Sequence, residues 1–301
     1  MDLGLILCTY SLQDYNQSDA LPVAGARPST TDRLPLVSVI MSMRNSATTV
    51  GTAIRSVLMQ SLRDFELIVI DDGSSDQSAA IVEAFGDRRI HLIREARSAG
   101  LAARLNQAVA LSRGEFVARM DADDICFPDR LSRQIARLGE DPKLDLIGCG
   151  AVVFTSNGDL VGEIPIGLDH EEIVSRPFVG FPFPHPTWCG RASWFRNHPY
   201  DGSLEYAEDQ DLLLRSFRHS RLAGLDSVLL AYRQDRLSLK KLLPGRATFA
   251  KSAWRHGSAT GEALPALGGI AATPPLVVSQ RQNETSSGWA PSSASVRAIT
   301  K

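Results

Sequence analysis

The stretch FELIVIDDG at residues 65–73 decides the fold class, because a strand-like apolar run in it ends directly in two carboxylates. Its first part, Phe65–Ile70, is the length of a strand and is apolar almost throughout, as expected for a strand buried on both faces. A matching run, LVSVIMSM at Leu36–Met43, precedes it along the chain. Between the two runs, residues 50–58 place apolar side chains at helical spacing. The order strand, helix, strand indicates an α/β sheet.

The same alternation continues to about residue 154. Further strands are expected at Ile90–Arg94, Glu115–Met120 and Leu144–Phe154, and a helix is expected at Leu101–Leu111. Alternating strands and helices predict a mostly parallel sheet flanked by helices, with right-handed crossovers. Because ligands of such sheets bind at the carboxyl ends of the strands, the acidic residues there are candidate site residues.

Composition limits the classes of protein that the chain can belong to. A chain of 301 residues with 44% hydrophobic residues is large enough for a substantial core. A net charge of −2 gives no electrostatic basis for binding nucleic acid. The four cysteines have no metal-binding or disulfide spacing, so reduced thiols are expected.

No apolar run reaches the roughly 20 residues that a bilayer crossing needs. Asp2 stands where a signal peptide would carry basic residues. We therefore expect a cytoplasmic protein, and contact with the inner face of the membrane stays open. The sequence gives no basis for predicting an oligomeric state.

The sequence pattern divides the chain into four parts. Residues 1–34 are polar and irregular, which predicts a flexible N-terminal extension. Residues 35–235 form the α/β domain, whose pattern loosens after residue 155 into loops rich in proline and aromatic residues. Residues 236–256 are expected to be helical. Residues 257–301 are rich in Ser, Ala, Gly, Thr and Pro, and disorder is expected there.

The segment Asp121-Ala122-Asp123 follows the expected strand Glu115–Met120. On an extended chain, carboxylates at i and i+2 lie on one face and can share a hard cation such as Mg²⁺ or Mn²⁺. A solvated acidic turn is the simpler alternative. A further alternative is the motif of aspartyl-phosphate hydrolases, in which the first Asp is a nucleophile. That motif belongs on the first strand of its domain, whereas this segment follows the fourth.

The segment DDGSSD at Asp71–Asp76 has three interpretations: a Mg²⁺ pocket like that of receiver domains, a nucleoside-binding turn, or a plain strand-to-helix loop with Asp76 as the N-cap of the helix. The nucleoside-binding interpretation has a physical basis, because a carboxylate accepts hydrogen bonds well from the N3–H of uracil or from a ribose hydroxyl.

Glu208-Asp209 lies directly before a helix expected at Gln210–Arg218. Acidic residues in a first helical turn are favoured by the helix dipole, which is the simpler explanation. The alternative is that one carboxylate is the general base for an acceptor hydroxyl. His185 lies between two prolines and is expected in a surface loop, with an acceptor-site or phosphate-side role as the alternative.

Together and in this order, these motifs resemble the family 2 inverting glycosyltransferases of the GT-A fold. The resemblance covers roughly residues 35–235 and is carried by PLVSVIMSMRNSATTVGTAIRSVLMQS, DFELIVIDDGSSD, ARMDADDICFPDRLSRQ, HPTWCGR and YAEDQDLLLRSF. It implies a Rossmann-like nucleotide-diphospho-sugar transferase in which residues 35–155 bind the nucleotide sugar and residues 156–235 face the acceptor.

The resemblance also implies donor-side roles. Ser42 and Arg44 should line the nucleobase pocket, and Asp72 should contact the base. Asp121 should lie near the ribose and the diphosphate, and Asp121 and Asp123 should hold Mg²⁺ or Mn²⁺. Family members usually carry Tyr where Arg44 stands, so stacking of a guanidinium on the base would replace stacking of a ring.

On the acceptor side, the resemblance implies Asp209 as the catalytic base with Glu208 beside it. The implied reaction is metal-dependent, inverting transfer from a nucleotide-diphospho-sugar, UDP-sugar by family precedent, to a glycan or lipid-linked acceptor in cell-surface polysaccharide biosynthesis. Many family members have a His shortly after a Tyr-Arg pair, where this chain has Gln234. A catalytically impaired sugar-nucleotide-binding protein is therefore the alternative.

Overall fold

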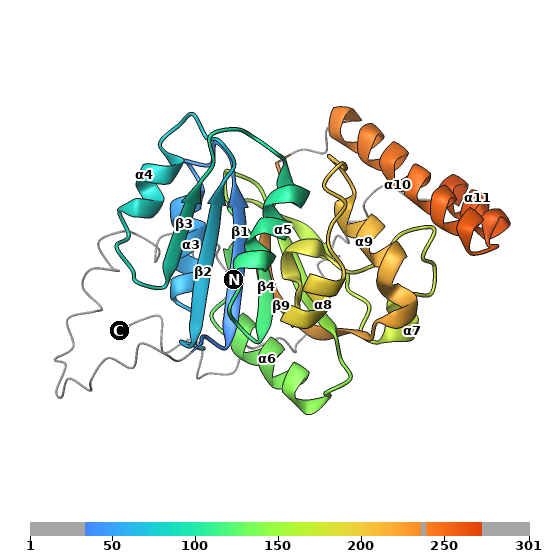
Figure 1. The fold of residues 1–301 in the computed structure, drawn as a ribbon, viewed down its shortest axis with the longest axis horizontal. Helices are drawn as coiled ribbons and strands as arrows, with labels where there is room; N and C mark the ends of the chain where they lie inside the picture. Colours follow the sequence, from blue (N-terminus) through green and yellow to red (C-terminus); the bar gives the residue numbers. More distant parts are fainter. Residues whose placement is uncertain (1–33, 236–238, 273–301) are drawn as a thin grey trace.

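The structure is a computed structural model that describes residues 34–235 and 239–272, and these residues form a twisted sheet with helices on both faces (Figure 1). The strands are β1 Val37–Met43, β2 Phe65–Asp71, β3 Ile90–Arg94, β4 Phe116–Asp121, β5 Ile125–Cys126, β6 Leu146–Phe154, β7 Leu160–Ile164, β8 Cys189–Arg191 and β9 Leu222–Arg233. The α-helices are α3 Val50–Leu58, α4 Ser78–Glu83, α5 Leu101–Leu111, α6 Arg130–Glu140, α7 His170–Ile173, α8 Ala192–Asn197, α9 Glu208–Ser216, α10 Leu239–Ala259 and α11 Ala263–Ala272, and the 3₁₀ turns are η1 His185–Thr187 and η2 Phe217–His219.

The first half of the sheet is parallel, as the sequence predicts. Its strands run in the order β3-β2-β1-β4, and each neighbouring pair is parallel. Ser42 near the end of β1 lies opposite Ile70 of β2 and Asp121 of β4. The strand-end carboxylates Asp71 and Asp121 therefore meet at one edge of the sheet, because parallel strands point their carboxyl ends the same way.

Beyond β4 the sheet becomes mixed. The order continues β8-β6-β9-β5, with β7 on β6. Strand β8 is antiparallel to both β4 and β6, whereas the long β6–β9 pair is parallel. The short strand β8 thus links the parallel half of the sheet to the mixed half, and the turn η1 lies directly before it.

Alternation along the central strands produces two cores. Val39 and Met41 of β1 point to a core shared with α3 and α6, whereas Ile40 points to a core shared with α5, α8 and α9. Side chains of a strand alternate between faces, so one apolar run serves both cores. The expectation of strands buried on both faces is confirmed.

The C-terminal part differs from the expectation of disorder over 257–301. Helix α10 ends at Ala259, and α11 follows at 263–272 and packs on it. Ala266 is fully buried, and a Cβ at Gly257 would lie 2.6 Å from its methyl carbon, so the absent side chain allows the close approach. Two small residues form this contact, and the sequence around them has no strong periodic pattern. Residues 1–33 of the predicted N-terminal extension and residues 273–301 of the predicted disordered tail lie outside the described residues.

None of the helices in the described part of the chain combines the length and apolar character that crossing a bilayer requires.

Candidate active site

Three carboxylates gather where β4 ends, and we call Asp121, Asp123 and Asp124 the strand-end cluster. One oxygen of each lies within 4.8 Å of the others. Asp124 was not singled out from the sequence, although it directly follows the predicted pair. One of its oxygens accepts a bond from the main-chain N–H of Arg233 at 2.8 Å, and the other is buried without a partner among the described residues.

The electrostatics of the strand-end cluster favour a bound cation. Desolvation by the atoms packed around the strand end, and then the charge of Asp121, raise the pKa of Asp123 to about 6, although Asp123 keeps an exposed face. Burial and the charges of Asp121 and Asp123 raise the pKa of Asp124 well above its ordinary value. Like charges this close resist simultaneous ionisation unless a cation lies among them. A set of carboxylate oxygens is what Mg²⁺ and Mn²⁺ prefer, so the residues present fit such an ion.

Asp72 lies in the loop after β2 and is held entirely by protein donors. Its two oxygens accept four hydrogen bonds, from Ser98 Oγ, Ala99 N, Gly100 N and Arg104 Nε. A carboxylate has about four acceptor positions. The Asp72 carboxylate thus fastens the loop before α5, and a base that bonds to it would have to share or displace one of these donors. Its predicted role in base binding stays a prediction.

The segment Asp71–Asp76 is tied to the end of β1. Asn45 Oδ1 accepts from Ser75 N at 2.9 Å, and Asp76 Oδ2 accepts from Ala47 N at 3.0 Å. Asp76 lies in the loop and accepts from Ser78 N at 3.0 Å, but the N-cap of α4 is Gln77 and not Asp76. Arg44 directly precedes Asn45, and its side chain is exposed to solvent.

A second group of titratable side chains lies at the start of α9, and we call His185, Glu208 and Asp209 the helix-start cluster. One polar atom of each lies within 4.8 Å of the others. His185 Nδ1 is 3.5 Å from Glu208 Oε1, and His185 Nε2 is 2.8 Å from the hydroxyl of Tyr200. The helix begins at Glu208, two residues earlier than expected, so both acids belong to its first turn.

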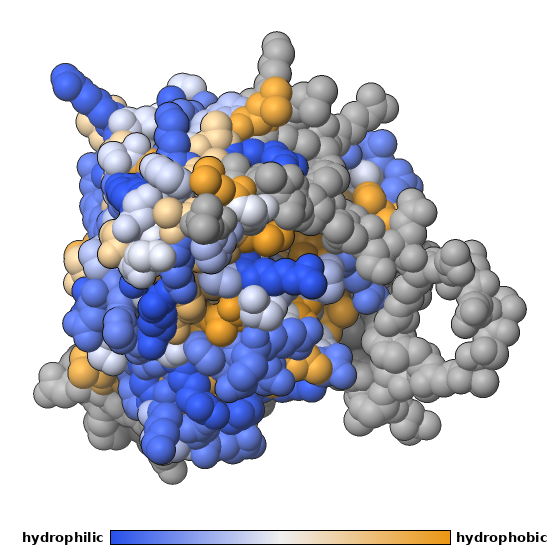
Figure 2. Space-filling model, turned by 90° about the vertical axis from the view of Figure 1, so that its right-hand side faces the viewer, coloured by the Kyte–Doolittle hydropathy of each residue, from blue (hydrophilic) through white to orange (hydrophobic). Residues whose placement is uncertain are grey.

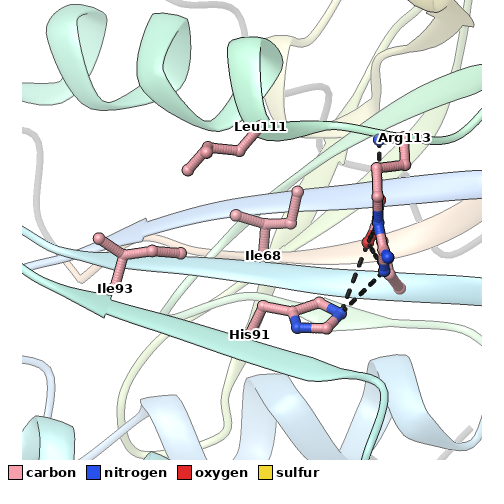
Figure 3. A pocket seen from close by; sticks show the side chains of 6 residues that line it. Ile68, His91, Ile93, Leu111 and Arg113 are labelled. Atoms are coloured by element: carbon pink, nitrogen blue, oxygen red, sulfur yellow. Dashed lines mark hydrogen bonds and ion pairs between the residues drawn. The ribbon is translucent and has the colours of Figure 1, made fainter.

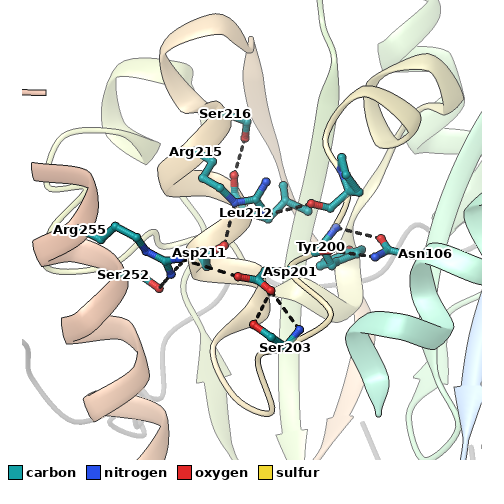
Figure 4. Close-up of polar contacts among 11 residues, drawn as sticks. Asn106, Tyr200, Asp201, Ser203, Asp211, Leu212, Arg215, Ser216, Ser252 and Arg255 are labelled. Carbon is teal, nitrogen blue, oxygen red and sulfur yellow. Dashed lines mark hydrogen bonds and ion pairs between the residues drawn. The ribbon is translucent and has the colours of Figure 1, made fainter. Parts of the chain in front are cut away.

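His185 is buried, and the expectation of a surface loop is wrong. Its ring lies 4.6 Å from that of Trp188 and 5.4 Å from that of Tyr200. Asn106 of α5 fixes Tyr200 in turn, since its side chain accepts from Tyr200 N and donates to Tyr200 O, each at 2.9 Å (Figure 4). The two prolines around His185 shape the turn η1, which packs on β4 rather than facing solvent.

Burial sets the protonation of the helix-start cluster. It lowers the pKa of His185 to about 3, so the imidazole is neutral near pH 7. It also raises the pKa of Glu208 and of Asp209, and the charge of Glu208 raises that of Asp209 further. A carboxylate whose pKa is raised is a better proton acceptor, which suits Asp209 to general base catalysis.

The two clusters act on common neighbours. The charges of Asp121 and Asp209 both act on His185 and on Tyr200. The charges of Asp121 and Glu208 both act to raise the pKa of Arg119 in β4. Asp121 and Asp209, which were predicted for the two halves of the site, therefore have common neighbours in His185 and Tyr200. The sequence did not indicate Arg119 or Tyr200, which carry no motif of their own.

A separate cavity of about 230 Å³ lies beside β2 and β3, toward their amino ends and away from the carboxylate clusters (Figure 3). Ile68, Ile93 and Leu111 form its apolar side. At its rim, Arg113 Nη2 pairs with Glu66 Oε2 at 2.6 Å. Its position near the amino ends of the strands separates it from both carboxylate clusters.

Comparison with known proteins gives a consistent result. The profile described as glycosyl transferase family 2 matches residues 38–198. The Bacillus subtilis (strain 168) protein EpsE is 34% identical over 214 residues, which cover 69% of this chain and 76% of EpsE. WfgD of Escherichia coli, a UDP-Glc:alpha-D-GlcNAc-diphosphoundecaprenol beta-1,3-glucosyltransferase, is 34% identical over 147 residues, which cover 48% of this chain and 57% of WfgD.

Among solved structures, residues 1–349 of S. aureus TarS in complex with UDP-GlcNAc superpose with a TM-score of 0.60 at 19% identity. The match covers 77% of this chain and 72% of that one. At this identity the likeness concerns the fold, in which a mixed sheet is flanked by helices.

Proposed function

This chain belongs to glycosyltransferase family 2 and has the GT-A fold, and we propose that it transfers a sugar from a UDP-sugar to a hydroxyl group with inversion at the anomeric carbon. The observation that carries the proposal is the pair of clusters around β4. One cluster fits a cation and a diphosphate, and the other presents a half-buried carboxylate whose raised pKa suits it to accept a proton. Inversion needs a single displacement, with the base on the acceptor side and the diphosphate on the opposite side.

Asp121 and Asp123 would hold Mg²⁺ or Mn²⁺. The buried, unpartnered oxygen of Asp124 and the mutual repulsion of the three carboxylates support a cation in the strand-end cluster. When bound, the ion would neutralise the developing charge of the nucleoside diphosphate as it departs. Arg233 Nε donates to the main-chain oxygen of Asp123 at 2.8 Å and so fixes the backbone of this cluster.

Asp209 would take the proton of the acceptor hydroxyl as its oxygen attacks the anomeric carbon. Glu208 beside it raises the pKa of Asp209, which favours proton transfer. Neutral His185 contacts Glu208 and Tyr200 and would keep the orientation of the acids without competing for the proton. Base catalysis of this kind is typically worth about 10²–10⁴-fold in rate.

The nucleotide would lie along the carboxyl edge of β1, β2 and β4. Ser42 and the exposed Arg44 would line the base pocket, and a guanidinium can stack on a base as a tyrosine ring does. Asp72 would reach the base from the loop after β2. The UDP-GlcNAc bound to TarS and the UDP-Glc in the name of WfgD support uracil as the base.

We propose that residues 35–155 bind the donor and that residues 156–235 face a glycan or lipid-linked acceptor in cell-surface polysaccharide biosynthesis. The diphosphoundecaprenol acceptor in the name of WfgD supports this class of acceptor. An enzyme that uses such an acceptor would be cytoplasmic and would bind peripherally to the inner face of the membrane. Exposed Leu243 and Trp254 on α10, with the exposed Lys251 between them, suit an anionic lipid surface.

Figure 2 views the molecule from the side of α10 and α11, where hydrophobic areas are scattered among hydrophilic ones. Such a surface fits reversible contact with a membrane better than insertion. Flotation with vesicles that contain anionic lipid would recover the protein, and flotation with neutral vesicles would not. Equal recovery from both kinds of vesicle, or none from either, would contradict the proposed contact with an anionic membrane surface.

Calorimetry with UDP, with and without Mn²⁺, tests the donor site, and release of UDP from UDP-glucose and UDP-GlcNAc tests turnover. Metal-dependent binding with release supports the proposed enzyme. Metal-dependent binding without release from any of a panel of UDP-sugars, with or without acceptors, would favour a sugar-nucleotide-binding protein, for which Gln234 is the supporting observation. No binding of UDP would contradict the proposed donor.

A further inference from the structure

Asn106 on helix α5 holds the main chain of Tyr200 at both of its polar groups. Its Oδ1 accepts from Tyr200 N, and its Nδ2 donates to Tyr200 O, each at 2.9 Å (Figure 4). The two residues are 94 positions apart in the sequence, so the pair joins distant segments. A side-chain amide that donates to and accepts from the same residue fixes both the position and the orientation of that residue, because hydrogen bonds weaken when distance or angle changes.

The side chain of Tyr200 continues from this contact to the helix-start cluster. Its hydroxyl lies 2.8 Å from Nε2 of His185, and the other ring nitrogen, Nδ1, lies 3.5 Å from Oε1 of Glu208. Only 4% of Tyr200 and 7% of His185 are exposed, and the ring of Trp188 lies 4.6 Å from that of His185. Because close-packed side chains transmit strain, a displaced Tyr200 would move the imidazole that neighbours Glu208.

The amino end of the same helix is held by the carboxylate of Asp72. The main-chain N–H groups of Ala99 and of Gly100, the N-cap of α5, donate to it at 2.7 Å and 3.0 Å. Arg104 Nε, within the helix, donates to it at 2.6 Å. Arg104 lies two residues before Asn106. One helix therefore joins the carboxylate proposed to contact the base with the segment that supports the helix-start cluster.

We propose that α5 sets the position of the helix-start cluster relative to the nucleoside site, and that Asn106 is the positioning residue through which it does so. The route runs from Asn106 to Tyr200, and from there through His185 to Glu208. Glu208 directly precedes Asp209, the proposed base. The naming of the nucleoside site and of the base rests on the proposed function, whereas the route from Asn106 to Glu208 rests on contacts that need no ligand.

Nitrogen NMR of the protein labelled with ¹⁵N-histidine tests the route without any ligand. The ring signals of His185 are identified by their loss in His185→Gln. Tyr200→Phe should shift them because it removes the hydroxyl beside Nε2, and Asn106→Ala should shift them because it frees the segment that carries this hydroxyl. Unchanged His185 signals in folded Asn106→Ala would overturn the proposal.

Arg191→Met is the matched control, because Arg191 also joins distant segments by bonds to main-chain groups. Its Nε donates to Leu144 O and its Nη2 to Leu138 O, each at 3.0 Å. Arg191 is the last residue of β8 and lies opposite Phe116, at the amino end of β4. Arg191→Met should lower stability and leave the His185 signals and kcat as in wild type. Signals shifted as far as in Asn106→Ala would mean that any loosening of the fold reaches His185, which would overturn the role of Asn106.

Asn106→Gln is the conservative variant. It keeps a donor and an acceptor for Tyr200 on a side chain that is one methylene longer, so it should shift the His185 signals less than Asn106→Ala does and keep more of the activity. If Asn106→Ala does not fold, Asn106→Gln takes its place. Unchanged His185 signals in Asn106→Gln would then overturn the proposal.

Kinetics show whether the route serves the reaction. In folded Asn106→Ala, kcat for UDP release from UDP-glucose or UDP-GlcNAc should fall about 10–100-fold, because a small misplacement of a catalytic group is costly. The Kd for UDP with Mn²⁺ should stay within about twofold, since the bonds of Asp72 remain. A merely structural defect would weaken UDP binding as much as it lowers kcat, and that result, or an unchanged kcat, would overturn the proposal.

The double variant tests whether Asn106 and Tyr200 act through one route. Asn106→Ala with Tyr200→Phe should be no slower than the slower single variant, because effects on one route do not add. Effects that multiply would overturn the route through Tyr200. If the wild-type protein releases no UDP from any UDP-sugar, the proposed function is wrong, and the His185 signals still decide the role of Asn106.

Discussion

The strand-end cluster and the helix-start cluster contain the same kind of group, yet the structure prepares them for opposite chemistry. At the end of β4, three carboxylates face one another, and their mutual repulsion adds to the effect of burial. At the start of α9, two carboxylates lie beside a neutral imidazole and aromatic rings. A metal ion would relieve the repulsion in the first arrangement, and a proton would neutralise a carboxylate in the second.

The cause of a raised pKa therefore tells more than the raised pKa itself. Asp123 and Asp209 both hold protons more tightly than ordinary aspartates. Asp123 follows the end of β4 and is exposed, so a divalent cation and a phosphate could reach it. Asp209 is the second residue of α9, a helix that packs in the core shared with Ile40, α5 and α8. Their positions, rather than their sequence motifs, support the proposed metal-binding role of Asp123 and the proposed base role of Asp209.

The largest expected effect comes from Asp209→Asn, which removes the base and keeps the shape. We expect kcat to fall about 10²–10⁴-fold with UDP binding unchanged, because the donor side does not contain Asp209. Rates of UDP release from UDP-sugars and calorimetry check this. Asp211→Asn is the control on the same helix, where Asp211 pairs with Arg215 at 2.8 Å. Asp211→Asn should lower stability and leave kcat unchanged. A near-normal rate for Asp209→Asn would contradict the assignment of the base to the helix-start cluster.

A smaller effect is expected from Asp123→Ala on the metal side. Loss of one of the oxygen ligands should weaken UDP binding about 10–100-fold in the presence of Mn²⁺, and much less in EDTA. Titration of UDP in both conditions gives the difference. Asp129→Ala removes a nearby exposed carboxylate outside the cluster and should change neither. Equal UDP affinity of wild type and Asp123→Ala with Mn²⁺ would contradict a metal in the strand-end cluster.

The burial of His185 predicts a pH effect on stability. Folding lowers its pKa from an ordinary value of 6.5 to about 3, so between these values the unfolded chain binds the extra proton. Stability from this group is thus complete above pH 6.5 and is lost as the pH falls toward 3. Each pH unit corresponds to about 1.4 kcal/mol, so the loss from pH 7 to pH 5 is about 2 kcal/mol.

In His185→Gln this part of the acid destabilisation should disappear, as urea unfolding at pH 7 and at pH 5 would show. The exposed His219, changed to Gln, should leave the pH dependence as in wild type. An unchanged pH dependence in His185→Gln would mean that the imidazole takes up a proton in the folded protein. The contrast between the two clusters would then be weaker.

The smallest effect is expected at an exposed arginine that α10 places beside a buried carboxylate of α9. Arg255 of α10 lies 3.5 Å from Asp211 and 4.0 Å from Asp201 (Figure 4). Its side chain is 61% exposed, so Arg255→Met should change the free energy of unfolding by less than about 1 kcal/mol. Thermal unfolding measures this. A larger loss would show that ion pairs, more than the apolar contacts of Phe249 and Ala253, attach α10 to the domain.

The sequence by itself determined the parallel half of the sheet and the places of the acids along the chain. Strand β3 and helix α5 have the predicted bounds, and Asp121 is the last residue of a strand that was expected to end one residue earlier. These predictions hold because a strand buried on both faces and an amphipathic helix leave local patterns that need no knowledge of distant partners.

Tertiary structure alone decided which polar groups are buried and what they face. His185 lies in a proline-rich turn that a sequence pattern places at the surface, yet Trp188 and Tyr200 enclose it. The carboxylate of Asp72 is occupied by the loop before α5, and α11 packs where no periodicity predicts a helix. Arg119 reads in the sequence as an ordinary strand residue, yet in the structure it is buried and pairs with Asp121 at 2.5 Å. Burial and charge pairing depend on segments far apart in the chain, so no local pattern can contain them.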